Sequence, residues 1–292
     1  MTATSFLLIL LSAIAHAGWN FLLKRANDHE VFVWWMQLGI SVIFCPLAIA
    51  LCILTPIKYP EGWIFVLGTS VLHAFYFVLL GRGYAHGDLS TVYPVARGTG
   101  PALVPILGVF ILGEAISSQA IIGIVAVVVG IFVVYWSGNL TKILKNPLMF
   151  FSEKSTMYAL ATGIFICLYS VWDKKGVAYV SPFLYMYLMA LGSGIFITPY
   201  ILKARSMGAL IDEWRLNYRA IVLVSALTFI AYGLVLSALT LSKLSYVWPA
   251  REMGIVAAVL LGSLVLKEPF GRSRLLGSLM VVFGVALVAL AP

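Results

Sequence analysis

Two arginines of this chain lie far inside apolar segments, where charged side chains are expensive and usually functional. Arg97 is about eight residues into its segment and Arg251 about six, so each lies roughly 10 Å from the segment end at 1.5 Å per residue. A guanidinium forms paired hydrogen bonds with carboxylate or phosphate, so the two arginines predict a site for an anionic or zwitterionic ligand. The alternative is internal satisfaction, by Glu252 or by carbonyl groups freed at Pro94 and Pro249.

Glu252 is the only carboxylate deep in an apolar segment, and it directly follows Arg251. Neighbouring residues on a helix point about 100° apart, so these two side chains need not pair with each other. Glu252 is therefore a candidate for proton coupling, and a structural role as the partner of Arg97 is the alternative.

Three further side chains are candidates for carrying a proton. Asp173 ends an apolar segment, where the neighbouring Lys174 and Lys175 favour a solvated helix end over a place facing a cavity. His16 and His73 lie within apolar segments, and the alternative for each is a packed, hydrogen-bonded histidine.

Aromatic residues gather at similar depths in these segments. Tyrosine and tryptophan offer an apolar face and a hydrogen-bonding group, which suits the wall of a solute cavity. The alternative is an interfacial belt of aromatic residues. Besides the two arginines, we predict that the substrate-binding wall consists of Trp19, Asn20, Tyr76, Tyr93, Tyr169, Trp172, Tyr232 and Trp248.

The composition identifies the medium that surrounds these residues. Of the 292 residues, 62% are hydrophobic and 10% are charged, against roughly 45–50% and 25% in soluble domains. A soluble fold of this length cannot hide so much apolar surface, so lipid must solvate it. Because the apolar runs are continuous rather than alternating, helices are predicted in place of a barrel. We assign the net charge of +8 to loops between the spans and expect no nucleic-acid partner.

A helix needs about twenty apolar residues to cross a bilayer. That rule predicts an all-α integral membrane protein with ten transmembrane helices, in the inner or plasma membrane of the cell. The predicted spans are 3–23, 31–54, 62–83, 89–113, 117–137, 156–174, 181–203, 217–240, 245–266 and 272–291.

The two halves of the chain repeat at an offset of 154 residues. Between 96–134 and 250–288, twelve of thirty-nine positions are identical, and they include Arg97/Arg251 and Glu114/Glu268. We therefore predict five-helix repeats at 1–137 and 156–292, joined by a linker at 138–155. Five is odd, so the halves enter the membrane in opposite orientations and form a 5+5 inverted repeat around a central cavity, as secondary transporters do.

Glycines also repeat within the last span of each half. They lie seven residues apart on one helix face and suit close helix contact, either within the protein or in a homodimer. These glycines are Gly123, Gly130, Gly277 and Gly284.

Motifs of known enzyme chemistry are missing from the sequence. It contains no HExxH metal motif, no P-loop and no Gly-Xaa-Ser-Xaa-Gly elbow. We therefore predict no catalytic residues, no cofactor, no metal site and no ATP hydrolysis.

Several stretches resemble the EamA-type branch of the drug/metabolite transporter superfamily, and the resemblance covers essentially the whole chain. In the first half they are Ala15–Asn20 with Lys24–Ala26, Gly87–Gly98 and Leu112–Glu114, and in the second half Trp248–Arg251 and Lys267–Glu268. The resemblance implies a cavity lined by spans one, three, four, six, eight and nine, with alternating access to the two sides of the membrane. It also implies transport of small metabolites without ATP, and both termini in the cytoplasm. Phosphate translocators of the superfamily hold substrate with basic residues on spans four and nine, the spans of Arg97 and Arg251, although no local motif is shared.

These observations predict a secondary-active carrier of a small anionic or zwitterionic metabolite, which binds near Arg97 and Arg251. Proton coupling and exchange both remain open, as do the direction of transport and the identity of the substrate. A broad-specificity exporter of hydrophobic compounds, or a lipid-group flippase, is the alternative and would work without the arginines. A membrane interaction protein that transports nothing leaves the two deep arginines unexplained.

The loop charges predict an orientation that differs from the one the resemblance implies. Thirteen Lys and Arg residues fall in the loops after odd-numbered spans, four fall after even-numbered spans, and Arg97 and Arg251 complete the total of 19. Cytoplasmic loops carry the excess of these residues. The charge distribution therefore predicts that both termini lie outside the cell.

Overall fold

The computed structural model describes residues 1–292 except 24–25, 87–88, 137–152 and 267–271, and describes only the backbone of 20, 21, 84, 89–94, 136, 258 and 261–266. The described residues are helical and contain no strand. In chain order the helices are α1 (Ala3–Leu23), α2 (His29–Ile43), α3 (Cys45–Leu54), α4 (Glu61–His86), α5 (Leu89–Leu112), α6 (Ser118–Trp136), α9 (Lys154–Gly176), α10 (Pro182–Ala204), α11 (Met207–Leu241), α12 (Leu244–Arg251), α13 (Met253–Leu266) and α14 (Arg272–Ala289).

Each predicted span coincides with one helix or with a broken pair of helices. Among the described residues, seven helices are long and apolar enough to cross a membrane, and the pair α2 and α3, bent by 55°, makes an eighth. The second broken pair is α12 and α13, separated at Glu252. The equivalent helix of the first half, α5, runs unbroken through Pro94, Pro101 and Pro105.

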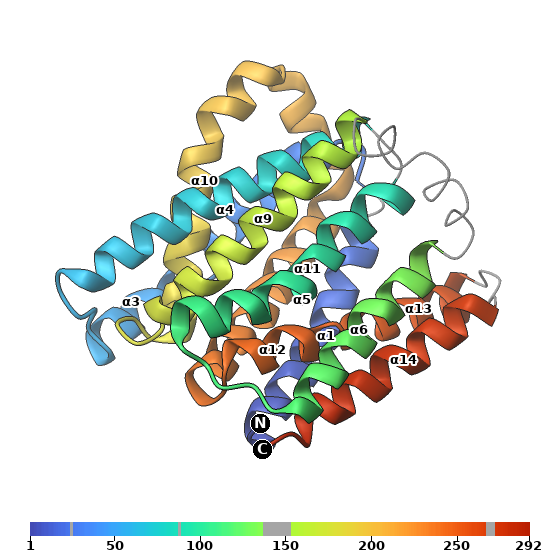
Figure 1. The fold of residues 1–292 in the computed structure, drawn as a ribbon. Helices are drawn as coiled ribbons and strands as arrows, with labels where there is room; N and C mark the ends of the chain where they lie inside the picture. The colour runs from blue at the N-terminus through green and yellow to red at the C-terminus, as the bar shows by residue number, and fades with distance from the viewer. Residues whose placement is uncertain (24–25, 87–88, 137–152, 267–271) are drawn as a thin grey trace.

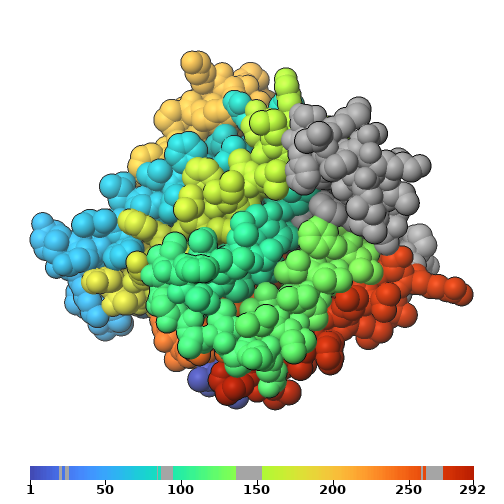
Figure 2. All heavy atoms as spheres, in the orientation of Figure 1, coloured from blue at the N-terminus to red at the C-terminus, as the bar shows by residue number. Residues whose placement is uncertain are grey.

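The two halves interlock instead of standing side by side. Helix α1 packs on α11, and its repeat equivalent α9 packs on α4 (Figure 1). The last helices of the halves, α6 and α14, lie against each other along one edge of the molecule, as Figure 2 also shows. Each half therefore completes the packing of the other.

Glycines bring α6 and α14 together within this chain. A Cβ atom added at Gly123 would lie 2.6 Å from the carbonyl oxygen of Gly284, and one added at Gly277 would lie 2.7 Å from that of Gly130. Only a residue without a side chain permits this backbone approach. The glycine face expected to serve either an internal or a dimer contact is thus used internally.

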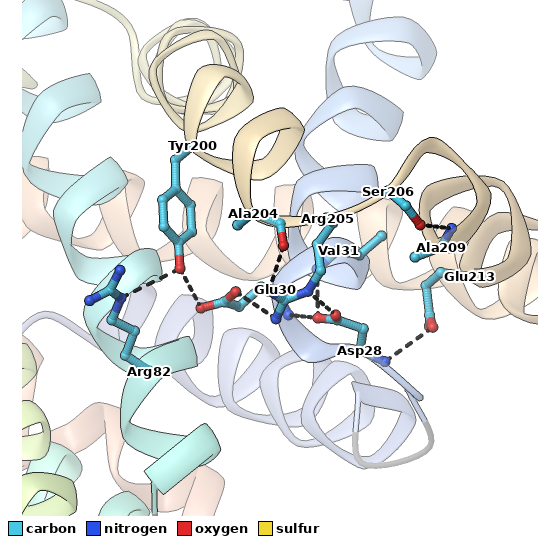
Figure 3. Close-up of polar contacts among 10 residues, drawn as sticks. All are labelled: Asp28, Glu30, Val31, Arg82, Tyr200, Ala204, Arg205, Ser206, Ala209 and Glu213. Carbon is cyan, nitrogen blue, oxygen red and sulfur yellow. Dashed lines mark hydrogen bonds and ion pairs between the residues drawn. The ribbon is translucent and has the colours of Figure 1, made fainter.

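One end of the helix bundle is closed by charged residues between α2 and α10 (Figure 3). Arg205, which follows α10, donates from Nε to Asp28 at 2.5 Å and from Nη2 to Glu30 at 3.0 Å. Tyr200 donates to Glu30, and Arg82 of α4 donates to Tyr200. The hydrogen bond to Asp28 raises the pKa of the Arg205 guanidinium. These contacts tie three helices together at the end of the molecule opposite the termini.

The termini meet at the other end of the bundle (Figure 1). The amino group of Met1 donates to the carbonyl oxygens of Ala289 and Ala291 at 3.5 and 3.3 Å. A chain whose two ends share one side of a membrane must cross it an even number of times.

Candidate functional site

A cavity lies at the centre of the bundle, where both halves contribute side chains. It is lined by His16 and Trp19 of α1, Met36 and Gln37 of α2, His73, Tyr76 and Phe77 of α4, Tyr169 of α9, Met186 and Met189 of α10, Thr228, Ala231 and Tyr232 of α11, and Arg251 of α12. Most of these side chains are aromatic or methionine. Arg251 is the only Lys, Arg, Asp or Glu among the described residues that line the cavity.

Glu114 holds the short helix that carries Arg251. The helix α5 ends at Gly113, whose φ of +67° a glycine adopts without strain. The chain then turns so that the Glu114 carboxylate accepts from the backbone N–H groups of Leu244 and Ser245 at 2.7 and 2.9 Å. A carboxylate satisfies the free N–H groups at a helix start and interacts favourably with the helix dipole.

Arg251 has unused hydrogen-bonding capacity at the cavity wall. The residue is 6% exposed, and its Nε and Nη1 atoms have no hydrogen-bond partner among the described residues. Its guanidinium lies 4.8 Å from the ring centre of Trp248 and 5.4 Å from that of Tyr232. The two rings stabilise the cation without using its N–H donors, so the donors remain available to an anionic ligand.

Arg97 of α5 is engaged with Glu252. Its Nη2 atom lies 3.3 Å from Glu252 Oε2, and the two side chains are 11% and 2% exposed. The structure thus shows the partnership that was the alternative to a ligand site for Arg97 and to proton coupling for Glu252. Among the described residues, Arg97 is not part of the cavity wall, and neither is any other residue of α5.

A sequence difference between the repeats explains why Arg97 has an ion-pair partner and the equivalent Arg251 has none among the described residues. At the offset of 154 residues, the position equivalent to Glu252 is Gly98. Two buried arginines therefore share one neighbouring carboxylate. Glu252 pairs with the arginine of the other half, and Arg251 is left without an ion-pair partner among the described residues.

Asp173 is fully buried, which corrects the expectation of a solvated helix end. Tyr185 donates to Oδ1 at 2.9 Å, and Tyr232 donates to Oδ2. The neighbouring Lys174 does not pair with Asp173, because its ammonium group donates to the carbonyl oxygens of Leu239 and Ser242. Burial is possible here because two phenol groups satisfy the carboxylate.

The two candidate histidines, His16 and His73, face the cavity and are hydrogen-bonded. The Nδ1 atom of His16 accepts from the indole N–H of Trp19 at 2.8 Å. His73 lies with Nδ1 3.0 Å from the carbonyl oxygen of Thr69, and its ring centre is 4.1 Å from that of Tyr169. The packed, hydrogen-bonded alternative therefore describes their geometry.

Other predicted wall residues are divided between the cavity and its surroundings. Trp248 lies behind Arg251 and meets the edge of Tyr169 at 6.0 Å between ring centres. Trp172 does not line the cavity. Its indole occupies the space over Gly68, which has no side chain, and donates to the carbonyl oxygen of Phe65 at 2.9 Å.

Tyr76, Tyr169, Tyr232 and Trp19 line the cavity as expected. The side chains of Asn20 and Tyr93 lie outside the described part of the structure.

Gln37 is a wall residue that the sequence analysis missed. Its Nε2 atom donates to Ser193 Oγ at 2.6 Å, and Ser193 in turn donates to the carbonyl of Ala190. This order of donors fixes the amide orientation and leaves Gln37 Oε1, which is buried, without a partner among the described residues. A lone amide inside an apolar run was the signal that could have found it.

Comparison with known proteins gives a family and a fold. The EamA-like transporter family matches residues 3–136 and again residues 154–290. No curated protein matches the chain. A solved structure titled "Crystal structure of protein" shares 13% sequence identity and a TM-score of 0.68, with 99% of each chain covered. At that identity the likeness shows the fold alone.

Proposed function

The chain belongs to the EamA-like transporter family, and we propose that it carries a small anionic or zwitterionic solute across the membrane by alternating access, without ATP. The family match and the apolar helices make it a multi-pass membrane transporter. The substrate class is our inference from the cavity.

The availability of Arg251 is the observation that carries this proposal. A buried guanidinium with two unused N–H positions is costly unless a ligand completes its hydrogen bonds. A carboxylate or phosphate group matches the planar arrangement of its donors. We therefore expect the anionic group of the solute to bind at the unused Nε and Nη1 donors of Arg251.

Gln37 supports a solute that also donates hydrogen bonds. Its free Oε1 atom accepts from an ammonium, amide or hydroxyl group. Because Gln37 lies on α2 and Arg251 on α12, one solute that reaches both would bridge the two halves of the protein. A bridging solute favours the occluded state over the open states, as alternating access requires.

We further propose ten membrane crossings, arranged as five-helix repeats at 1–137 and 156–292, in the inner or plasma membrane of the cell. The meeting of the termini supports an even number, and the symmetric pairing of α1 with α11 and α9 with α4 supports the repeat. In this arrangement the broken pairs α2–α3 and α12–α13 each count as one crossing.

The test combines binding and transport with variants of Arg251. Purified protein is first screened by thermal shift against small carboxylates, phosphate esters and amino acids, since a ligand at 100 times its Kd stabilises by about 2.7 kcal/mol. For the best ligand, Arg251→Ala should lose charge-assisted hydrogen bonds worth about 1.5–3 kcal/mol, or roughly ten- to a hundred-fold in affinity. Arg251→Lys should recover only part of the loss, because an ammonium lacks the planar pair of donors.

The matched control is Arg215→Ala, which removes an exposed arginine of α11 outside the cavity wall. This variant should bind and transport as the unaltered protein does. Normal uptake of every solute by Arg251→Ala would show that the carrier does not use a cation to hold its substrate.

A second candidate function is export of apolar compounds, which the methionine and aromatic wall favours. Met36, Met186, Met189 and Phe77 line the same cavity, and methionine adapts to ligands of varied shape. In this case Arg251→Ala would retain export of lipophilic dyes from proteoliposomes, whereas substitution of the methionines would reduce it.

A further inference from the structure

Asp173 is a buried ionisable residue that takes no part in the proposed binding of the solute. Its carboxylate is 0% exposed, and no Lys or Arg nitrogen among the described residues lies within ion-pairing distance of it. An ionised carboxylate in such a place is expensive, and binding a proton removes the cost.

The hydrogen bonds around Asp173 accommodate either protonation state. With the carboxylate ionised, Tyr185 donates to Oδ1 at 2.9 Å. The same hydroxyl group lies 3.2 Å from the carbonyl oxygen of Phe65. When Asp173 takes a proton, its new O–H can donate to Tyr185 Oη while the tyrosine O–H turns to Phe65. No buried donor is then left without an acceptor.

Tyr232 connects Asp173 to the solute cavity. Its hydroxyl group donates to Asp173 Oδ2, and its ring both lines the cavity and lies 5.4 Å from the Arg251 guanidinium. Tyr232 thus contacts Asp173 through its hydroxyl group and Arg251 through its ring.

The groups that contact Asp173 or interact with it electrostatically come from four neighbouring helices, α4, α10, α11 and α12. Tyr185 comes from α10, Tyr232 from α11, and Arg251 from α12 interacts with it electrostatically. On α4, Thr69 is a near neighbour of Asp173, and its hydroxyl group contacts His73. On its own helix Tyr169 lies one turn away, and the Lys174 ammonium is held by carbonyls of α11 and of the turn that follows it.

The charges nearest the cavity balance only when the anion site is empty. Arg97 and Arg251 supply two positive charges, and Glu252 and Asp173 supply two negative ones. A solute anion at Arg251 adds an uncompensated negative charge, which a proton on Asp173 would cancel. We propose that Asp173 binds a proton that is carried together with an anionic solute, and that the Tyr185 hydroxyl group turns from Asp173 to the carbonyl oxygen of Phe65 as it does so.

The direction of coupling follows from electrostatics. The positive charge of Arg251 favours the ionised form of Asp173, and an anion bound at Arg251 weakens that effect. Anion binding therefore promotes proton uptake, and by linkage proton uptake promotes anion binding. The proton comes from the water on the side to which the cavity is open and adds to a carboxylate oxygen without other bond changes. The inference of co-transport rests on the proposed function, whereas the proton site itself does not.

Infrared difference spectroscopy tests the proton site without a solute. The full chain in lipid nanodiscs should show, as the pH is lowered, the carbonyl stretching band of a protonated carboxylic acid. That band should be missing in Asp173→Asn and retained in the double variant Arg97→Gln with Glu252→Gln, which removes the other buried carboxylate near the cavity together with its ion-pair partner. Labelling aspartate carboxyl groups with 13C should shift the band of the unaltered protein, which assigns it to an aspartate even if Asp173→Asn does not fold. Asp173 is the only buried aspartate among the described residues.

Two further variants test the hydrogen bonds and the linkage. Tyr185→Phe should shift the frequency of the band, because the protonated acid loses its acceptor. Arg251→Gln mimics neutralisation by an anion and should keep Asp173 protonated at a pH at least one unit higher, a tenfold rise in proton affinity. Absence of an aspartate band at any pH at which the protein stays folded would overturn the proton site, and an unchanged midpoint in Arg251→Gln would overturn the linkage.

Transport separates this inference from the function on which it rests. The probe is a radiolabelled mixture of small carboxylates and acidic amino acids, offered to proteoliposomes with an alkaline interior. The unaltered protein should accumulate label, and Asp173→Asn should lose accumulation but keep counterflow. An infrared band without any uptake would refute the proposed substrate class alone, and uphill accumulation by Asp173→Asn would refute the coupling role of Asp173.

Discussion

Two arginines at equivalent positions have different surroundings because one residue differs between the repeats. Glu252 stands in the second half where Gly98 stands in the first, and it pairs with Arg97 across the interface between α5 and α12. Arg251 instead stacks between Tyr232 and Trp248 and keeps two N–H positions unused. The same repeated position therefore holds an ion-paired arginine in the first half and an arginine with unused donors in the second.

The first residue-scale prediction concerns the buried pair itself. Glu252→Ala should destabilise the protein by about 3–5 kcal/mol, because it leaves the Arg97 cation buried without its carboxylate. The double variant Arg97→Gln with Glu252→Gln should recover much of this loss. Thermal unfolding in detergent or nanodiscs measures both, and Arg215→Gln at an exposed position should stay within about 0.5 kcal/mol of the unaltered protein. If Glu252→Ala were as stable as this control, the pair would have no structural role.

Between helices, glycine determines how closely the final helices of the two halves approach. The backbones of α6 and α14 meet at Gly123 with Gly284 and at Gly130 with Gly277. A side chain at any of these positions would collide with a backbone carbonyl group, which cannot rotate away as a flexible side chain can. The contact depends mainly on shape, since both helices are largely apolar, and Gln119 of α6 adds a hydrogen bond to the carbonyl oxygen of Leu287 in α14.

Gly123→Ala should therefore destabilise the protein, in spite of the higher helix propensity of alanine. The added Cβ would lie 2.6 Å from the carbonyl oxygen of Gly284, and overpacking of this kind costs about 1–3 kcal/mol. Gly208→Ala in α11 is the matched control, since its nearest neighbour is 3.8 Å away, and it should be neutral or stabilising by up to about 1 kcal/mol. Equal melting temperatures for the two variants would contradict the close contact.

For the whole molecule, the pairing of helices across the halves has a consequence for movement. Because α1 packs on α11 and α9 packs on α4, a tilt of one pair relative to the other changes the cavity wall at both ends. The contacts of Arg205 with Asp28 and Glu30 close the end opposite the termini (Figure 3). Partly exposed ion pairs of this kind contribute roughly 0–1 kcal/mol each, so they can open and re-form during transport.

Orientation in the membrane is the prediction that belongs to this scale. Arg205 belongs to the loops after odd-numbered predicted spans, to which the sequence assigns thirteen of the 19 Lys and Arg residues, so its end of the bundle should face the cytoplasm with the termini outside. Each misplaced charge would cost about 2.3 kcal/mol per 100 mV of membrane potential. In a cysteine-free background, which requires replacing Cys45, Cys52 and Cys167, a cysteine at Ser206 should resist an impermeant maleimide in intact cells.

A cysteine at Tyr59, which is 81% exposed at the other end of the bundle, should label under the same conditions. The opposite pattern, with Ser206 labelled and Tyr59 protected, would place the termini in the cytoplasm, as the family resemblance implies. Permeabilised cells provide the reference in which both positions should react.

The sequence by itself determined the features that depend on solvent and chain length. Continuous apolar runs of about twenty residues can only be helices in lipid, so the helix positions followed from composition. The 154-residue repeat indicated two related halves, and the depth of Arg97 and Arg251 marked them as exceptional. Each of these inferences needs only neighbours along the chain.

The tertiary structure decided which residues meet. Asp173 was expected to be solvated beside two lysines, but Tyr185 and Tyr232 reach it from other helices and bury it. Gln37 lines the cavity although it was not predicted to, and Trp172 does not line it although it was. Their positions are set by Ser193 and Gly68, which lie on neighbouring helices. A side chain within a lipid-spanning helix has apolar neighbours along its own helix almost everywhere. Its polar environment is therefore set by lateral contacts between helices, and a single sequence contains no local signal for these contacts.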